Sequence, residues 1–290
     1  MIRLIGIIVG LGFTLVVLIA FGSGAYTAAT EGLGEPTAEH EFHLTPREVH
    51  LASDGPLGHW DTQQLQRGYQ VYKEVCSACH SLSLVAFRDL AQLGYTDAEV
   101  KAAAAEWTVP GIDPVTGEVN TRPGTPTDYF PKAFANDIAA RAANNNAIPP
   151  DLSLITKARH DGPAYVYSLL TGYRDPNTFN LGGKSLREEF PNFETPTGLY
   201  FNPYFPNLNI AMAPPITSEG QVTYADGTRP TVTQMSEDVA AFLTWAAEPT
   251  LVKRKQTGWA VVGFLIFATI LAWFAKKQVW APITPKRQKD

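Results

Sequence analysis

Five consecutive residues, Cys76-Ser77-Ala78-Cys79-His80, carry the most specific chemistry in this 290-residue sequence. Two thiols separated by two residues can each form a thioether with a vinyl group on one edge of a porphyrin, and the adjacent histidine then lies under the iron. We therefore predict that Cys76 and Cys79 attach one haem c covalently and that His80 is an axial ligand of its iron.

Three other uses of paired cysteines fit less well. A thioredoxin-like redox motif follows a strand, and no β-branched run precedes Cys76. A structural zinc site needs four nitrogen or sulfur ligands, and the sequence contains only two cysteines. A disulfide would suit an oxidising compartment but gives His80 no role.

A haem iron bound by His80 needs either a second protein ligand, for electron transfer, or an open position, for gas or peroxide chemistry. The candidates are the methionines and His40, His43, His50, His59 and His160. Met1 is excluded by its position, and Met235 lies on the apolar stripe of a predicted helix, so we expect it in the core.

Met212 lies in the stretch Ile210-Ala211-Met212-Ala213-Pro214-Pro215. Its small neighbours leave room for a flat macrocycle, and the two prolines stiffen the backbone. A buried methionine that fills a gap in the core would look similar, but we favour Met212 as the sixth ligand. Ligation by histidine and methionine leaves no open site and raises the redox potential.

The charge is distributed unevenly along the sequence. Residues 27–250 contain 27 acidic and 14 basic side chains, whereas eight basic residues and one acidic residue follow Thr250. This pattern predicts an acidic soluble domain followed by a basic segment close to a membrane. The acidic excess could serve solubility, steer a basic partner, or do both.

Two apolar stretches are long enough to be membrane segments. Leu4–Phe21 follows Arg3, so residues 1–25 are either a signal peptide, cleaved near Ser23-Gly24-Ala25, or a retained anchor. Both alternatives export the residues that follow.

The second stretch, Gly258–Ala275, has no charged residue and is flanked by tryptophans, which predicts a transmembrane helix over residues 258–280. More basic residues follow this stretch (Lys276, Lys277, Lys286, Arg287, Lys289) than precede it (Lys253, Arg254, Lys255). The bias indicates that residues 281–290 form a basic cytoplasmic tail and that the haem domain lies outside.

Capping residues and apolar periodicity predict five helices in the domain. One begins after Asp61, with Leu65, Tyr69, Tyr72 and Val75 on one face, and leads to Cys76. The others run from Thr96 to about Trp107, from Asn136 to the asparagines 144–146, from Pro163 to about Thr171, and from Thr233 to Ala247. We expect residues 26–56, 109–131 and 173–231 to lack regular structure.

Several stretches resemble the cytochrome c1 family, the haem subunits of quinol:cytochrome c oxidoreductase (bc1) complexes. They are Val71 to His80, Arg141 to Asn145, Pro149 to Ser153, Ala158-Arg159-His160, Tyr165 to Tyr173, Tyr200 to Pro206, Met212 to Pro215 and Trp245 to Pro249. They occur in the family's order and cover roughly residues 45–280.

The resemblance implies axial ligation by His80 and Met212 and haem contacts from Asn144, Pro149, Pro150, Arg159 and Tyr165. Arg159 can neutralise a haem propionate, and Tyr165 can place its hydroxyl on one. A proline carbonyl can accept a hydrogen bond from the far ring nitrogen of His80. We interpret His160 as a packing or hydrogen-bonding residue.

Three features depart from the family pattern. Asn146 stands where glycine is usual, but asparagine tolerates the left-handed conformation, so we expect the turn to persist. Two cysteines, both committed to haem, leave none for the extra disulfide of some bacterial relatives. The N-terminal apolar segment is also less typical.

These observations predict a mainly α cytochrome c-type haem domain over residues 26–250, enlarged by long loops and followed by a C-terminal transmembrane helix. The resemblance implies a non-catalytic electron-transfer subunit, in a bacterial inner membrane with its haem domain in the periplasm. It would take electrons from a Rieske iron–sulfur protein, beside a cytochrome b subunit, and pass them to a basic or membrane-tethered cytochrome c. No nucleic-acid partner is expected.

Three alternative functions remain from the sequence. The chain could be the haem subunit of another membrane dehydrogenase or oxidase. It could be a haem enzyme or sensor with an open distal site, or a thiol–disulfide oxidoreductase without haem.

Overall fold

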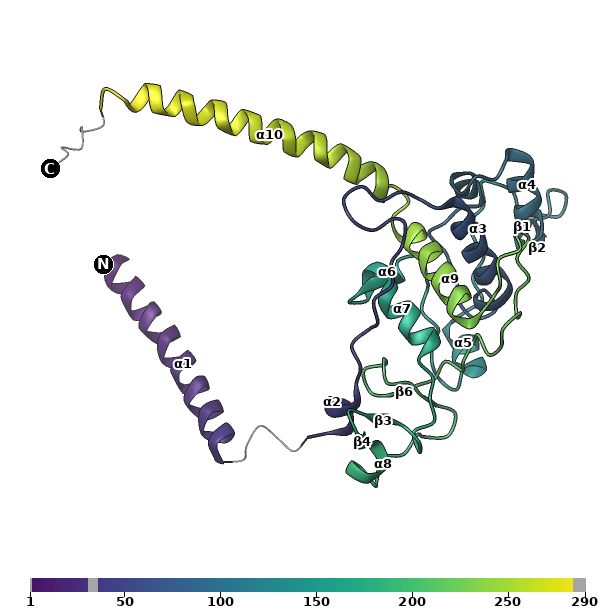
Figure 1. Cartoon of the computed structure of the whole chain (residues 1–290), viewed down its shortest axis with the longest axis horizontal. Coiled ribbons are helices and arrows are strands. Elements are labelled where there is room, and N and C mark those ends of the chain that lie inside the picture. Colours follow the sequence, from purple (N-terminus) through teal and green to yellow (C-terminus); the bar gives the residue numbers. More distant parts are fainter. Residues whose placement is uncertain (1, 31–35, 284–290) are drawn as a thin grey trace. The chain divides into compact units, whose positions relative to one another are not determined.

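The computed structural model describes residues 2–30 and 36–283. Lys286, Arg287 and Lys289, which belong to the predicted basic tail, lie outside the described residues. The chain divides into two compact units, Met1–His43 with Asn177–Phe193, and Leu44–Pro176 with Glu194–Asp290. Figure 1 shows the elements of both units, in which helices predominate, as predicted.

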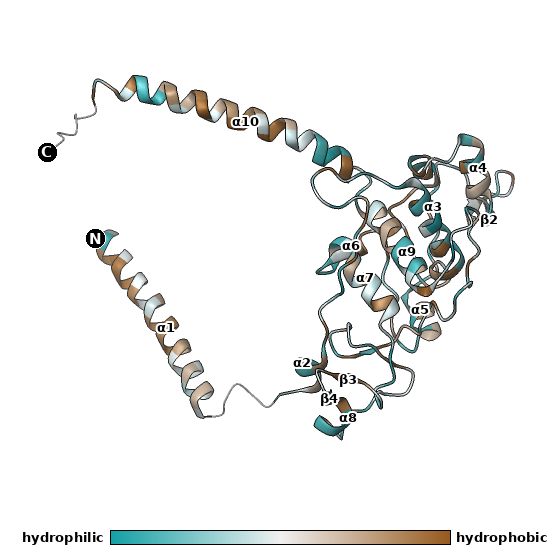
Figure 2. Cartoon of the chain, in the orientation of Figure 1, coloured by the Kyte–Doolittle hydropathy of each residue, from teal (hydrophilic) through white to brown (hydrophobic). Residues whose placement is uncertain are grey.

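The first unit begins with α1 (Ile2–Thr30), a helix whose described side chains are exposed and mostly apolar (Figure 2). The helix contains Ser23-Gly24-Ala25 and continues past Tyr26, where irregular structure was predicted. Alanines at 28 and 29 favour its continuation, which explains the difference.

The rest of the first unit is a small cluster of α2 (Ala38–Phe42), the paired strands β3 (Asn180–Leu181) and β4 (Lys184–Ser185), and α8 (Leu186–Glu189). The ring of Phe42 is almost fully buried and meets Phe179 and Phe190 edge to face, at centroid distances of 6.1 and 5.9 Å. The short helix α2 was not predicted. It forms because Thr37 caps it by accepting a hydrogen bond from the backbone N–H of His40.

The core of the second unit is built on α3 (Thr62–Val71) and α9 (Val232–Ala247), which lie side by side, with α6 (Ile155–Ala158) and α7 (Gly162–Thr171) against α9 (Figure 1). Asp61 and Thr231 cap α3 and α9 through their side-chain oxygens. A Cβ at Gly68 would overlap the carbonyl oxygen of Asp238, so only glycine allows the two helices to come this close.

The predicted apolar stripe of α3 faces this core. Leu65, Tyr69 and Tyr72 are buried, and Val75 is partly buried against them. Met235 of α9 is fully buried, which confirms its predicted place in the core. Phe242 and Trp245, also on α9, are buried too, so large side chains fill the space between the helices.

Residues 87–123 form a lobe beside this core. The 3₁₀-helix η2 (Phe87–Leu93) precedes α4 (Asp97–Ala105), and Thr96 and Glu99 form the predicted capping box of α4. β1 (Thr108–Ile112) and β2 (Val119–Pro123) then pair as an antiparallel hairpin. The prediction that residues 109–131 lack regular structure is therefore wrong in part. The prolines had suggested irregular structure because proline has no N–H to donate. In a two-stranded ribbon, however, each strand has one edge without a partner strand, and a proline whose nitrogen points to that edge costs no hydrogen bond between the strands.

Long loops make up most of the remaining domain, as predicted. The turn after α5 (Asp137–Ala143) contains Asn145 and Asn146, whose φ angles of 48° and 63° confirm that asparagine supports the left-handed conformation at 146. β5 (Tyr200–Phe201) pairs with β6 (Asn209–Ile210) inside a long loop region. With β3, β4 and α8, these short strands show that the prediction of no regular structure over residues 173–231 is wrong in part, because brief backbone pairings and a single helical turn leave no periodic signal in the sequence.

The last helix, α10 (Leu251–Trp280), starts two turns before the predicted span. Among the described residues, α1 and α10 are the helices whose length and composition would allow them to cross a membrane. At 1.5 Å per residue, α10 is about 45 Å long, so it exceeds a hydrocarbon layer of about 30 Å.

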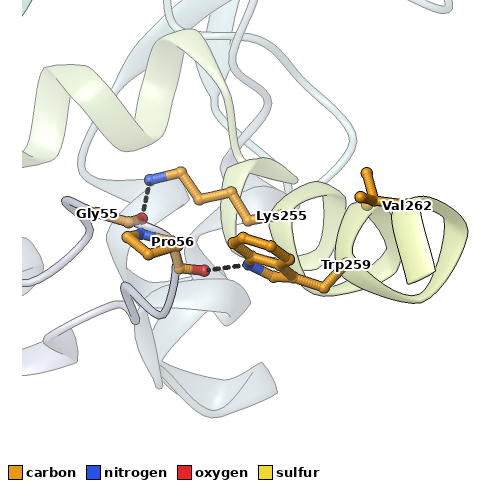
Figure 3. A pocket seen from close by; sticks show the side chains of 6 residues that line it. Gly55, Pro56, Lys255, Trp259 and Val262 are labelled. Carbon is orange, nitrogen blue, oxygen red and sulfur yellow. Dashed lines mark hydrogen bonds between the residues drawn. The ribbon is translucent and has the colours of Figure 1, made fainter. Parts of the chain in front are cut away.

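The first turns of α10 are bonded to the loop at residues 53–56 (Figure 3). Lys255 Nζ donates to the carbonyls of Ser53 and Gly55, each at 2.8 Å, and the Trp259 indole N–H donates to the carbonyl of Pro56 at 3.1 Å. A shallow, mostly apolar pocket here is lined by Gly55, Pro56, Lys255, Gly258, Trp259 and Val262. The loop therefore holds the start of the apolar helix.

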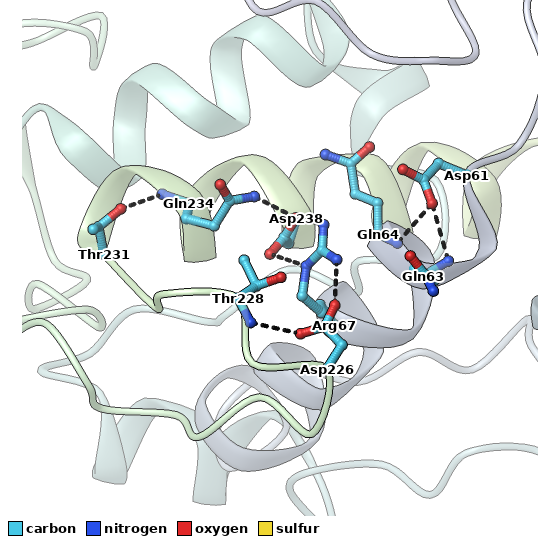
Figure 4. A network of polar contacts seen from close by, with 9 residues as sticks. All are labelled: Asp61, Gln63, Gln64, Arg67, Asp226, Thr228, Thr231, Gln234 and Asp238. Carbon is cyan, nitrogen blue, oxygen red and sulfur yellow. Dashed lines mark hydrogen bonds and ion pairs between the residues drawn. The ribbon is translucent and has the colours of Figure 1, made fainter.

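One ionic network joins α3 to α9 (Figure 4). Arg67 of α3 donates to both carboxylate oxygens of Asp238, at 3.0 and 3.2 Å, and to Asp226 at 2.7 Å. Gln234 adds a fourth hydrogen bond, to Asp238 at 2.9 Å. Asp238 is completely buried, so its charge depends on these partners.

Replacing Asp238 with alanine should lower the free energy of unfolding by about 3 kcal/mol, because it leaves the largely buried Arg67 with one carboxylate partner instead of two. Urea unfolding of the detergent-solubilised chain, followed by circular dichroism, measures this. Glu219→Ala is the control, since it breaks an exposed ion pair with Arg229 and should cost less than about 1 kcal/mol. Equal losses of unfolding free energy in the two variants would contradict the role of Asp238 as the buried partner of Arg67.

Candidate haem site

The cysteine motif lies at the end of α3, where the helix widens. A π-helical turn, η1 (Tyr72–Cys76), follows α3 directly, and the N–H of Ser77 donates to the carbonyl of Tyr72 at 2.8 Å. The N–H groups of Cys79 and His80 both donate to the carbonyl of Cys76, at 3.1 and 2.9 Å. The five residues therefore form one tight turn. They follow a helix and not a strand, which is unlike a thioredoxin-type motif.

The two thiols are free; Cys76 is half-buried and Cys79 is exposed. Burial raises the pKa of the Cys76 thiol to about 12. Thiol–disulfide exchange needs a thiolate at neutral pH, so this environment does not suit an oxidoreductase of that class.

His80 has one ring nitrogen engaged and one available. Its Nδ1 lies 2.8 Å from the carbonyl oxygen of Pro150, an acceptor only, so Nδ1 carries the proton and Nε2 is left free for a metal. Burial lowers the pKa of His80, which favours the neutral imidazole that binds metals.

Hydrogen bonds join the segment after Pro150 to the segment after His80. The N–H of Leu152 donates to the carbonyl of Ser81 at 2.9 Å, and the N–H of Ser83 donates to the Asp151 carboxylate at 2.9 Å. Burial opposes ionisation of Asp151, but hydrogen bonds from Ser153 and Ser83 lower its pKa overall, so the carboxylate stays charged. This fixes the Pro150 carbonyl opposite the His80 ring.

Met212 is half-buried and packs against the main core. The β5–β6 pairing ends two residues before it, at Ile210. Its own carbonyl accepts a hydrogen bond from the Tyr173 hydroxyl at 3.0 Å, and after it Gln221 Nε2 donates to the carbonyl of Pro215 at 2.7 Å. The methionine is thus held in a loop that is fastened on both sides.

The remaining predicted haem contacts lie on neighbouring elements of the same unit. Asn144, at the end of α5, is half-buried and donates to the carbonyl of Ala140 at 2.8 Å, and Pro149 is half-buried. Tyr165 of α7 is half-buried; burial raises its pKa, and the nearby charge of Arg159 opposes that shift. Arg159 is exposed and forms no ion pair with another described residue.

His160 behaves only partly as predicted. Its Nδ1 lies 3.0 Å from the Asp161 carboxylate, so it is a hydrogen-bonding residue. Its side chain is 97% exposed, so of the two predicted roles the structure shows hydrogen bonding and not packing.

The structure adds two tyrosine contacts that sequence reasoning missed. The Tyr72 hydroxyl donates to the backbone carbonyl of His80 at 3.1 Å, and the Tyr173 hydroxyl donates to that of Met212. Apolar periodicity indicated that Tyr72 is buried, but no sequence signal identifies the partner of a phenol hydroxyl.

The donor set suits an iron that is held in a porphyrin. One imidazole and one thioether are too few to hold a bare ion, and no three His, Cys, Asp or Glu side chains gather elsewhere among the described residues. Two thiols beside the imidazole supply the covalent attachment that a haem c needs.

Comparisons with known proteins agree with this chemistry. The profile of the Cytochrome C1 family matches residues 51–283. "Cytochrome c1 1, heme protein, mitochondrial" of Arabidopsis thaliana is 44% identical over 249 residues, which are 86% of this chain and 76% of that protein. "Cytochrome c1" of Rhodospirillum rubrum is 44% identical over 232 residues, 79% of this chain and 85% of that protein.

A third relative, "Cytochrome b/c1" of Bradyrhizobium diazoefficiens, is 47% identical over 236 residues, which are 78% of this chain but 34% of that longer protein. The residues matched by the family profile include most of the haem domain and all of α10. The chain belongs to the cytochrome c1 family.

Proposed function

We propose that this chain is the cytochrome c1 subunit of a bc1 complex and carries electrons from the Rieske iron–sulfur protein to a cytochrome c. The observation that carries the proposal is the turn at Cys76–His80, which presents two thiols and a neutral imidazole whose Nδ1 is held by Pro150. Family membership gives this donor set its role. Membership of this family also argues against the alternative that the chain is the haem subunit of another dehydrogenase or oxidase.

Cys76 and Cys79 would hold the haem covalently, and His80 and Met212 would bind its iron. The haem supplies one-electron redox chemistry when bound. The hydrogen bond from Nδ1 to Pro150 orients the His80 ring and raises its basicity. The loop around Met212 would keep the thioether in place, so that His80 and Met212 would both bind the iron and would leave it no position for a substrate. The subunit therefore carries electrons and breaks no bond in a substrate.

We propose haem contacts for the five other residues. Asn144, Pro149 and Pro150 would line one side of the macrocycle, since they lie on the segment that is fastened behind His80. Arg159 and Tyr165 would bind a propionate. The guanidinium of Arg159 lies close enough to influence Tyr165 and pairs with no described carboxylate, which leaves it available for a haem carboxylate.

The relatives support a partner within the complex. A protein named cytochrome b/c1 contains a region similar to this chain, so cytochrome b is the expected neighbour here. The Rieske protein would be the electron donor. The excess of acidic side chains over residues 27–250 supports a basic acceptor, either a soluble cytochrome c or one tethered to the membrane.

The membrane arrangement is also a proposal. Residues 258–280 of α10 would span the inner membrane of a bacterium, with residues 26–250 in the periplasm and residues 281–290 in the cytoplasm. Residues 1–25 would be either a signal peptide or a second anchor. The tryptophans near both ends of α10 support a helix that meets two membrane interfaces.

Gentle detergent solubilisation and purification of the native chain tests the function. A b-type cytochrome and a Rieske iron–sulfur protein should purify with it, and an alkaline pyridine haemochrome spectrum should show thioether-linked haem. Purification with a different set of dehydrogenase or oxidase subunits would contradict the proposal.

Met212→Leu should abolish the near-infrared sulfur-to-iron band and lower the midpoint potential by on the order of 0.1–0.3 V, because a thioether ligand stabilises the reduced iron. Met235→Leu is the matched control. Met235 is fully buried in α9, and a swap that conserves volume should leave the band and the potential unchanged. An unchanged band in Met212→Leu would mean that the ligand lies elsewhere.

A further inference from the structure

Tyr173 contacts the proposed sixth ligand without belonging to the predicted haem contacts. Its hydroxyl donates to the backbone carbonyl of Met212 at 3.0 Å, across 39 positions of sequence. Tyr173 follows α7 by two residues and is half-buried. The bond therefore links the end of a core helix to the centre of the methionine loop.

The chain around Tyr173 is held tightly. Helix α7 packs against α9, and a Cβ at Gly172 would overlap the ring of Tyr204. Asn202, which is completely buried, donates to the carbonyl of Leu169 at 2.8 Å and accepts from the N–H of Tyr204 at 3.1 Å. The backbone next to Tyr173 is therefore held by packing and hydrogen bonds, so its hydroxyl can hold the Met212 carbonyl in one position.

The methionine loop has less support of its own. The β5–β6 pairing stops at Ile210, and the next hydrogen bond along the loop, from Gln221, reaches Pro215. The bond from Tyr173 acts between these two points, on Met212 itself. His80 differs because it is joined to Cys79, which the haem would tether covalently, whereas Met212 would have no covalent tether to the haem.

We infer that Tyr173 is a positioning residue for Met212. The hydrogen bond from its hydroxyl to the Met212 carbonyl keeps the thioether on the iron when other ligands compete for that position. This inference rests on the proposed ligation by Met212. A loop that carries a ligand releases it by moving, so a hydrogen bond that this movement would break favours ligation. A typical hydrogen bond changes such an equilibrium roughly threefold to tenfold.

The test is a titration of the ferric, haem-loaded, full-length chain in detergent with imidazole, which competes for the sixth position. Loss of the near-infrared sulfur-to-iron band measures replacement of Met212. In Tyr173→Phe, half of the band should disappear at a roughly threefold to tenfold lower imidazole concentration than in the wild type.

Tyr204→Phe is the matched control. It removes a phenol hydroxyl from the same buried cluster, and among the described residues Tyr204 makes no hydrogen bond to the Met212 loop. Its titration should coincide with that of the wild type. Circular dichroism checks that both variants are folded.

Three results would overturn the inference. Tyr173→Phe could titrate like the wild type, both variants could shift equally, or Tyr173→Phe could fail to fold, which would give the hydroxyl a general structural role. A wild-type protein without the band would instead overturn the ligation by Met212 itself, so the two failures are distinguishable.

Discussion

The close contact between α3 and α9 determines where the haem motif can lie. Gly68 lets the backbones approach, and the ionic contact between Arg67 and Asp238 fixes one helix against the other. Because η1 and the cysteine turn continue directly from α3, any shift of α3 on α9 would move Cys76, Cys79 and His80 together. A buried ion pair gives little net stability on average, but breaking one is costly, so it suits a contact that must keep one geometry.

The two proposed iron ligands reach the site by different routes. His80 lies in a tight turn at the end of a core helix, and its ring is oriented by the Pro150 carbonyl. Met212 comes from a long loop that depends on separate hydrogen bonds at Ile210, Met212 and Pro215. The side-chain hydrogen bonds from Tyr173 and Gln221 fasten the loop that carries Met212.

Much of this arrangement could be predicted from the sequence. Caps at Asp61 and Thr96 and the stripe from Leu65 to Val75 depend on local spacing, and the structure has them where expected. The hairpin at residues 108–123 and the helix α2 were missed. Prolines suggested irregular structure in the hairpin region, yet a two-stranded ribbon accepts them at its edges.

The parts of the site that depend on the spacing of neighbouring residues could be predicted from the sequence. The hydrogen bonds that depend on the tertiary structure could not. Cysteine spacing indicated the tight turn at Cys76–His80, whereas the bond from Tyr173 to Met212 joins residues 39 positions apart and has no signal in the sequence. The most direct measurement of the central claim is near-infrared magnetic circular dichroism of the oxidised wild-type protein. The account predicts the charge-transfer band of histidine–methionine ligation at its characteristic energy. A band typical of two nitrogen ligands, or a high-spin spectrum with an open position, would contradict it.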